Sequence, residues 1–176
     1  MTTEGMGQGI AWKFGDNIST DQIVPSKYFH LRTNLPELTK HVLEDAILLH
    51  TTEKFVEVMS EGDYVVGGKN FGLGSSREHA PAIIKASGVR VVLAKSFARI
   101  FFRNSINVGL LVIMCDTDLI APKDVIDVDE KNGLVLNLSQ DVCIPFYSLP
   151  TIMIHILNAG GLINFVKQNQ GLVLPN

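Results

Sequence analysis

The strongest constraint on the fold is an alternation of apolar strands and amphipathic helices in the middle of the chain. Each apolar run has the length and the β-branched content of a buried strand. The apolar runs are at 63–66, 90–94 and 110–114, and the helical segments between them are at 77–86 and 96–108. Because such crossover helices return the chain to the same edge of a sheet, the pattern predicts parallel strands covered by helices.

The later part of the chain changes to an antiparallel pattern. Residues 125–128 and 134–138 flank Asp-Glu-Lys-Asn-Gly (129–133), which is typical of a β-hairpin. The fold class is therefore α/β: a mixed sheet with a parallel βαβαβ half and an antiparallel half, and helices packed around it. We expect a single domain over 9–176, preceded by a flexible N-terminal tail at 1–8.

The remaining segments predict shorter elements around this sheet. We expect a strand at 10–14, an ordered loop at 19–34, helices at 36–49 and 53–59, and a final helix at 150–167 that is broken near the two glycines at 160 and 161. The prediction of a helix at 36–49 is based on leucine, valine and alanine residues that recur at helical spacing, with Pro36 near its start.

Composition excludes several classes of function. The chain has 176 residues with 15 basic and 18 acidic side chains and no basic stripe, which argues against a nucleic-acid-binding protein. The first residues lack the basic segment followed by an apolar segment that a signal peptide has, so we do not expect secretion. The apolar stretch 100–114 is interrupted by Arg103 and two asparagines, so we do not expect a membrane span. The 46% hydrophobic content with only 19% charge indicates either a large core or a surface that a partner covers.

The two cysteines, Cys115 and Cys143, are far apart and fit no Cys/His ligand spacing. We expect two reduced thiols in a cytoplasmic protein rather than a disulfide. No metal ion or cluster is expected to be held by this chain alone.

The segment Asn-Phe-Gly-Leu-Gly-Ser-Ser-Arg-Glu-His (70–79) is the main candidate site. Its glycines allow close approach of a ligand to the backbone, and the following helix N-terminus favours an anion. Ser75 and Ser76 add hydroxyls, and Arg77 adds a planar fork that suits a carboxylate or phosphate. An ordinary capped loop would explain the glycines and one serine but not an arginine in a first helical turn, so we favour an anion site.

Known phosphate and nucleophile motifs do not fit this segment. It lacks the Gly-Lys-Ser/Thr ending of a Walker loop, the third glycine of a dinucleotide fingerprint and the Gly-x-Ser-x-Gly of a hydrolase elbow. His79 follows Ser75 by four residues on the same predicted helix and is interpreted as a packed structural histidine.

Two further polar clusters are weaker signals. Asp21 and Arg32 could converge across the 19–34 loop to bind a polyanion, although turn capping and a solvated surface cation are the ordinary alternatives. On the predicted 96–108 helix, polar residues such as Arg99, Arg103 and Asn104 fall on one face, and a solvated basic face explains them best.

Three segments resemble the small subunits of 3-isopropylmalate dehydratase, which form the detached swivel domain of the aconitase superfamily. They are Gly-Asp-Asn-Ile-Ser-Thr-Asp-Gln-Ile (15–23), Gly-Leu-Gly-Ser-Ser-Arg-Glu-His-Ala (72–80) and Ser-Phe-Ala-Arg-Ile-Phe-Phe-Arg-Asn-Ser-Ile-Asn-Val-Gly-Leu (96–110). The segment Ala-Gly-Gly-Leu-Ile-Asn-Phe-Val-Lys (159–167) is similar to the C-terminal part of that family. The resemblance covers nearly the whole chain.

The resemblance implies roles for particular residues. It assigns the first serine of the motif, Ser75, as the catalytic base in alkoxide form, and Ser76 and Arg77 as ligands of a substrate carboxylate. It also assigns substrate binding to Asp21, which matches the acid of the Thr-Asp motif, and to Arg32, which matches a substrate-binding arginine in the loop that follows.

The resemblance also implies a partner and a cofactor. The family removes and re-adds water on malate-type acids with a [4Fe–4S] cluster, and a cluster needs a set of cysteine thiolates that this chain lacks. The cluster is therefore expected on a separate large subunit, and this chain alone is expected to be inactive.

The substrate is less constrained than the reaction. Isopropylmalate, in leucine biosynthesis, is the first choice. Homoaconitase is an alternative because Arg32 would suit a second distal carboxylate, and 2,3-dimethylmalate dehydratase is another. A stand-alone carboxylate-binding module and a homo-oligomeric structural domain are the non-enzymatic alternatives.

Overall fold

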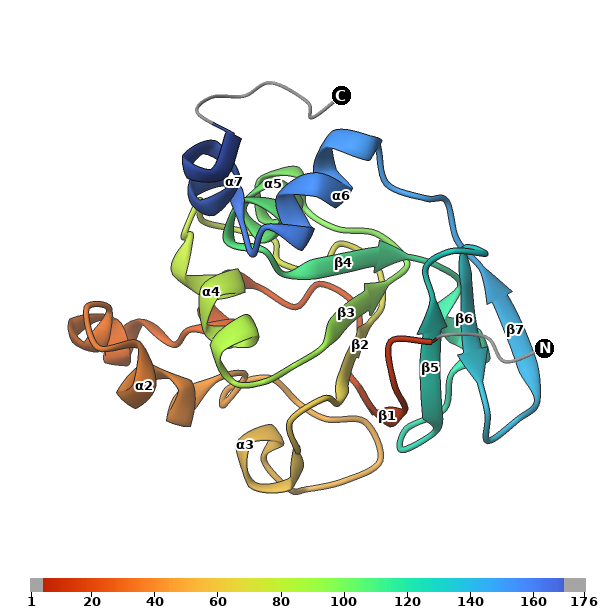
Figure 1. The fold of residues 1–176 in the computed structure, drawn as a ribbon. Coiled ribbons are helices and arrows are strands. Elements are labelled where there is room, and N and C mark those ends of the chain that lie inside the picture. The colour runs from red at the N-terminus through yellow and green to blue at the C-terminus, as the bar shows by residue number, and fades with distance from the viewer. Residues whose placement is uncertain (1–4, 170–176) are drawn as a thin grey trace.

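The computed structural model describes residues 5–169, in which seven strands form one mixed sheet of order β4-β3-β2-β1-β5-β6-β7 (Figure 1). The strands are β1 (Gly9–Lys13), β2 (Tyr64–Gly67), β3 (Val91–Ala94), β4 (Leu111–Met114), β5 (Val125–Asp129), β6 (Leu134–Asn137) and β7 (Val142–Pro145). Strands β1 to β4 are mutually parallel, whereas β5 to β7 are antiparallel to their neighbours. The predicted parallel and antiparallel halves are thus confirmed, and β1 joins them.

Four longer helices cover one face of the parallel half (Figure 1). They are α4 (His79–Ala86), α5 (Arg99–Val108), α6 (Thr151–Asn158) and α7 (Leu162–Asn169). The predicted break near Gly160 and Gly161 is confirmed, because both glycines have positive φ between α6 and α7. None of the helices between residues 5 and 169 is long and apolar enough to cross a membrane.

The opposite face of the parallel half packs against the antiparallel strands. Alternate residues of β2 point to opposite sides, so Val65 joins the core under the helices while Tyr64 and Val66 join a second core. Ile126 of β5 and Ile144 of β7 belong to that second core. The sheet therefore curls over itself and covers with its own strands the face that helices leave open.

The predicted helix at 36–49 is wrong. Helical structure there is limited to α2 (Leu35–Leu38) and the 3₁₀ turn η2 (Thr39–His41), after which Val42 is extended and Leu43 has φ of 55°. The Leu43 amide instead donates to the carbonyl of Ile23 at 3.0 Å. Of the apolar residues at helical spacing, Leu38, Val42, Leu43 and Ala46 are buried and Leu49 is partly buried, but they reach the core from an irregular segment.

Short helical turns occupy the segments on either side. The 19–34 loop contains α1 (Thr20–Ile23) and the 3₁₀ helix η1 (Ser26–Leu31), and the predicted 53–59 helix is present as α3 (Phe55–Val58). Another 3₁₀ turn, η3 (Thr117–Leu119), follows β4.

The start of the chain lies against the antiparallel half. Residues 1–4 of the predicted tail lie outside the described residues, whereas the Met6 amide donates to Val128 O at 3.0 Å and the Gly7 amide to Asp127 Oδ1 at 2.9 Å. The Tyr64 hydroxyl donates to the carbonyl of Gly7 at 2.7 Å. Residues 6 and 7, within the segment predicted as a tail, therefore contact both β5 and β2.

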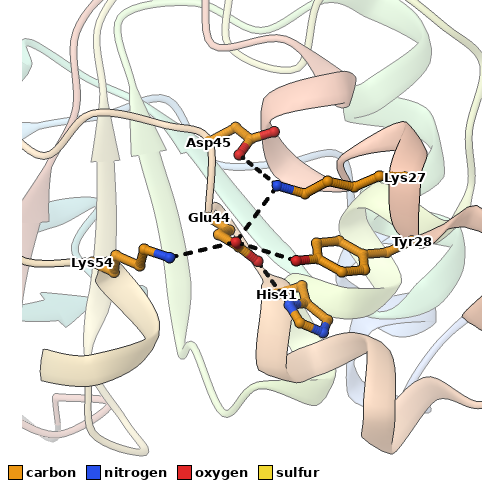
Figure 2. A network of polar contacts seen from close by, with 6 residues as sticks. All are labelled: Lys27, Tyr28, His41, Glu44, Asp45 and Lys54. Atoms are coloured by element: carbon orange, nitrogen blue, oxygen red, sulfur yellow. Dashed lines mark hydrogen bonds and ion pairs between the residues drawn. The ribbon is translucent and has the colours of Figure 1, made fainter.

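A polar network around Glu44 fixes the irregular segment in place (Figure 2). Tyr28 OH donates to Glu44 Oε1 at 3.2 Å, and His41 Nδ1 lies 2.7 Å from Glu44 Oε2. Lys27 and Lys54 each form an ion pair with the same carboxylate, at 3.6 and 3.5 Å. The network ties η1 to the chain after η2 and to the start of α3.

Glu44 is therefore expected to stabilise the fold in a pH-dependent way. Burial raises the pKa of Glu44, but hydrogen bonds from His41 and Tyr28 and the charges of Lys27 and Lys54 outweigh it and lower the pKa to about 2. Because the folded pKa lies below the unfolded value of about 4.3, the stabilisation is present above that value and is lost as the pH falls toward 2.

Glu44→Gln is expected to lower the free energy of unfolding by about 1 kcal/mol at pH 7, after allowance for solvent screening, and by much less near pH 2.5. Urea unfolding of both proteins at the two pH values measures this difference. Glu37→Gln is the matched control, since within residues 5–169 the Glu37 carboxylate forms only an exposed ion pair with Lys40. An equal effect of Glu44→Gln at both pH values would contradict the account.

Candidate functional site

The candidate site is built where the glycine-rich loop after β2 meets the segment before α1. The Gly72 amide donates to Ile18 O at 2.7 Å, and the Thr20 amide donates to Leu73 O at 2.8 Å. The Ser75 amide donates to the buried hydroxyl of Thr20 at 3.1 Å. Two of the motifs identified in the sequence are thus joined by hydrogen bonds at one end of the parallel strands.

Gly72 is required by this geometry. Its φ is 79°, and a Cβ at this position would lie 2.1 Å from Cγ of the buried Phe101. Any side chain would therefore strain the backbone and push against the core below the loop.

Gly72→Ala is expected to destabilise the fold by about 2–4 kcal/mol, from the clash and the left-handed backbone together. Thermal unfolding measures the effect. Gly15→Ala is the matched control, because a Cβ at Gly15 meets no atom within 4 Å. A Gly72→Ala protein as stable as the control would show that the loop readily adopts another path.

Arg77 and Asp21 form the charged centre of the site. The Arg77 guanidinium donates to Asp21 Oδ1, and it also reaches Ser26 Oγ at 3.3 Å and Val24 O at 3.4 Å. Ser26 Oγ donates to Asp21 Oδ1 at 2.7 Å. Hydrogen bonds from Ser26 and Arg77, with the positive charge of Arg77, hold the pKa of Asp21 below its usual value, so the carboxylate stays ionised and orients the guanidinium.

Arg32 lies beside the same centre through Phe29. The Arg32 Cζ atom is 4.9 Å from the Phe29 ring centroid, and the Arg77 Cζ atom is 5.9 Å from it. Arg32 also donates to the carbonyl of Phe29 at 3.3 Å. Three predicted site residues, Asp21, Arg32 and Arg77, are thus brought together from separate parts of the sequence.

The two serines are presented to solvent on the loop. Ser75 and Ser76 are exposed, and their hydroxyls have no hydrogen-bond partner within residues 5–169. Asn104 of α5 donates to the carbonyl of Ser76 at 3.3 Å, so part of the polar face of that helix borders the site. Both hydroxyls are free to contact a ligand, and the arginines supply positive charge for an anion.

The predicted helix start at Arg77 is wrong, because α4 begins only at His79. Residues 75–77 are not helical, and the carbonyls of Arg77 and Glu78 accept the first hydrogen bonds of α4, from the amides of Ala80 and Ala82 at 3.3 Å. The charge of Arg77 is balanced by Asp21 rather than by a ligand at the helix end. The predicted structural role of His79 agrees with its packing, since its ring meets the Phe29 ring edge-on at 6.1 Å.

Sequence reasoning missed Thr20, Ser26 and Phe29. Thr20 precedes Asp21 and Ser26 follows it by five residues, but no motif in the sequence singles out either hydroxyl. Phe29 carried no signal of its own, because a single aromatic residue in a loop is typical of core packing.

The chain offers no thiolate set for a metal centre. Cys115 follows β4 and Cys143 lies on β7, at opposite edges of the sheet, and both are free thiols. Burial raises the pKa of the Cys115 thiol to about 12. No group of three or more His, Cys, Asp or Glu within residues 5–169 is placed to hold a metal ion, so an iron–sulfur cluster does not fit this chain's own residues.

Known proteins match this chain over the region that contains these motifs. Residues 16–118 match the family described as the aconitase C-terminal domain. The chain is 53% identical to 3-isopropylmalate dehydratase small subunit 2 of Archaeoglobus fulgidus, over 92% of this chain and 94% of that protein. It is 52% identical to 3-isopropylmalate dehydratase small subunit 1 of Thermotoga maritima, over 93% and 96%.

A solved structure has the same fold. The crystal structure of 3-isopropylmalate dehydratase from Methanocaldococcus jannaschii superimposes with a TM-score of 0.86 and 40% sequence identity, covering 93% of this chain and 94% of that chain. The similarity therefore extends over both halves of the sheet and not only over the glycine-rich loop.

Proposed function

This chain belongs to the family of 3-isopropylmalate dehydratase small subunits, and from that membership we propose that it is the small subunit of a two-chain hydro-lyase. The enzyme isomerises 2-isopropylmalate to 3-isopropylmalate by removing water and adding it back in the opposite orientation. The observation that carries the proposal is the open loop at Ser75 and Ser76 beside the Asp21–Arg77 pair.

We assign Ser75 as the base that removes the proton from the carbon next to a substrate carboxylate. A serine hydroxyl is a weak base, so its alkoxide needs nearby positive charge and a site from which water is displaced. Arg77, held by Asp21, supplies that charge on the same loop. In the return step Ser75 gives the proton back to one carbon of the double bond while hydroxide adds to the other.

Substrate carboxylates are assigned to Ser76, Arg77 and Arg32. Arginine suits this task because its planar fork pairs with a carboxylate through two parallel hydrogen bonds. Arg32 meets no carboxylate within residues 5–169 and donates through Nη1 to the carbonyl of Phe29, so its other nitrogens are available to a ligand. Asp21 positions Arg77 rather than contacting the substrate.

A large subunit would complete the site. We propose that it carries the [4Fe–4S] cluster, which as a Lewis acid assists departure of the substrate hydroxyl, and that the complex works in the cytoplasm, where thiols remain reduced. The surface next to the loop suits a partner: Ile100 and Met114 are 49% and 52% exposed. A hollow of about 380 Å³ beside them is lined by residues that include Phe97, Phe102 and Arg103.

Homoaconitase is the second candidate function, and 2,3-dimethylmalate dehydratase is another alternative. The observation that favours homoaconitase is Arg32, whose guanidinium has no acidic partner in the described part of the chain and would suit a distal carboxylate. A stand-alone carboxylate-binding module would use the same cations without chemistry.

The test is anaerobic co-expression of this chain with its cluster-binding partner, followed by hydration assays on isopropylmaleate, homoaconitate and dimethylmaleate. We expect turnover only in the reconstituted complex, with isopropylmaleate preferred. A preference for homoaconitate would identify the second candidate. A cluster-containing complex that hydrates none of the three would overturn the proposal, and tight carboxylate binding by this chain alone would support the binding module.

A further inference from the structure

Phe29 is an exposed aromatic residue without a role in the core. All nine phenylalanines lie within residues 5–169, and Phe29, at 40% exposure, is the only one in the exposed class. Its neighbours Tyr28 and Leu31 pack against the main core, whereas Phe29 belongs to neither core cluster. Burial of apolar surface therefore does not explain why its ring is held where it is.

The ring contacts cationic groups instead. Its centroid lies within 6 Å of the guanidinium carbons of both Arg32 and Arg77, and the edge-on ring of His79 closes another side. A guanidinium over an aromatic face is attracted by the negative charge of the ring face. One aromatic ring thus links two cations that would otherwise repel each other.

The two arginines depend on Phe29 to different degrees. Arg77 is also held by Asp21, Ser26 and the Val24 carbonyl. Arg32 has no polar contact within residues 5–169 other than the carbonyl of Phe29. Loss of the ring therefore leaves Arg32 with a single backbone carbonyl as its partner and leaves Arg77 largely in place.

We infer that Phe29 is a positioning residue that holds Arg32 and Arg77 at a fixed separation to bind two carboxylates of one substrate. The inference rests on the proposed function for the identity of the ligand, but the arrangement of the cations does not. The ring itself contacts no reacting atom. The Glu44 network supports this role, because it fixes η1, the element that carries Phe29, through Lys27 and Tyr28 (Figure 2).

Kinetics of the two-subunit enzyme test the consequence for binding. Phe29→Leu is expected to raise KM about five- to tenfold with kcat changed less than twofold, and Phe29→Tyr, which keeps the ring, is expected to remain within twofold of the native protein. Tyr147→Leu is the matched control, because it removes an aromatic ring that is 98% exposed.

A double-mutant cycle identifies the group through which Phe29 acts. If the ring works through Arg32, Phe29→Leu adds little to KM in an Arg32→Ala background. Additive effects of the two substitutions, or a fall in kcat with unchanged KM for Phe29→Leu, would overturn the inference.

A second measurement is independent of activity. In ¹⁵N–¹H spectra of the whole chain, the side-chain Nε–H signals of Arg32 and Arg77 are expected to carry a ring-current shift that Phe29→Leu abolishes and Phe29→Tyr preserves. Unchanged signals in Phe29→Leu would refute the positioning role. If the native complex turns over none of the acids while these shifts behave as expected, the proposed function fails and the positioning of the arginines stands.

Discussion

Ser75→Ala in the reconstituted two-subunit enzyme is expected to lower kcat about 10³- to 10⁴-fold, which is the scale of a lost general base. The hydroxyl is exposed and has no hydrogen-bond partner within residues 5–169, so its removal breaks no hydrogen bond of the fold there. The contact that places the loop uses the backbone amide of Ser75 with Thr20 Oγ1, and alanine keeps it. Steady-state kinetics with co-purification of the two subunits measures both parts of the prediction.

Ser76→Ala is the matched control for that experiment. It deletes the neighbouring exposed hydroxyl on the same loop, and as a proposed carboxylate ligand Ser76 should affect KM more than kcat. A Ser75→Ala enzyme with native kcat would remove Ser75 from the chemistry. A larger loss of kcat in Ser76→Ala would move the base to the second serine.

Arg77→Gln is expected to lower kcat/KM about 10³-fold, since it removes both a carboxylate ligand and the charge next to Ser75. The substitution also leaves Asp21 without its cation, so a negative charge held only by the Ser26 hydroxyl lies at the site. Arg77→Lys is expected to recover only part of the loss. A lysine keeps the charge but cannot serve Asp21, Ser26 and a substrate with one planar group.

Two further variants make that result interpretable. Asp21→Asn keeps Ser26 and Val24 as partners of Arg77 and should cost less than Arg77→Gln. Lys40→Gln removes a cation from an exposed surface pair with Glu37 and should leave kcat/KM unchanged. Equal kinetics for Arg77→Gln and Lys40→Gln would mean that Arg77 is structural only.

Local sequence patterns predicted correctly those elements that depend on residues close together in the sequence. The strands at 64–67, 91–94 and 111–114 are buried over most of their length, and each carries the continuous apolar run that predicted it. The hairpin of β5 and β6 followed from its turn residues. These strands and this hairpin depend on residues that are neighbours in the sequence, and so the sequence alone predicts them.

Prediction failed where contacts distant in sequence determined the backbone. The apolar residues of 36–49 have helical spacing. The hydrogen bond from Leu43 to Ile23 and the network around Glu44 instead stabilise an irregular backbone over a continuous helix. The start of α4 was placed two residues too early because the loop at Ser75 is tied to Thr20 instead.

The sequence by itself determined the parallel βαβαβ unit, the hairpin, the glycine-rich loop and, through family resemblance, the candidate residues on it. Only the tertiary structure decided that the sheet curls to form a second core, and that Asp21 meets Arg77 across 56 residues of chain. Periodicity and turn chemistry act over a few residues, whereas the pairing of two distant charges and the position of Phe29 between two arginines require the complete fold.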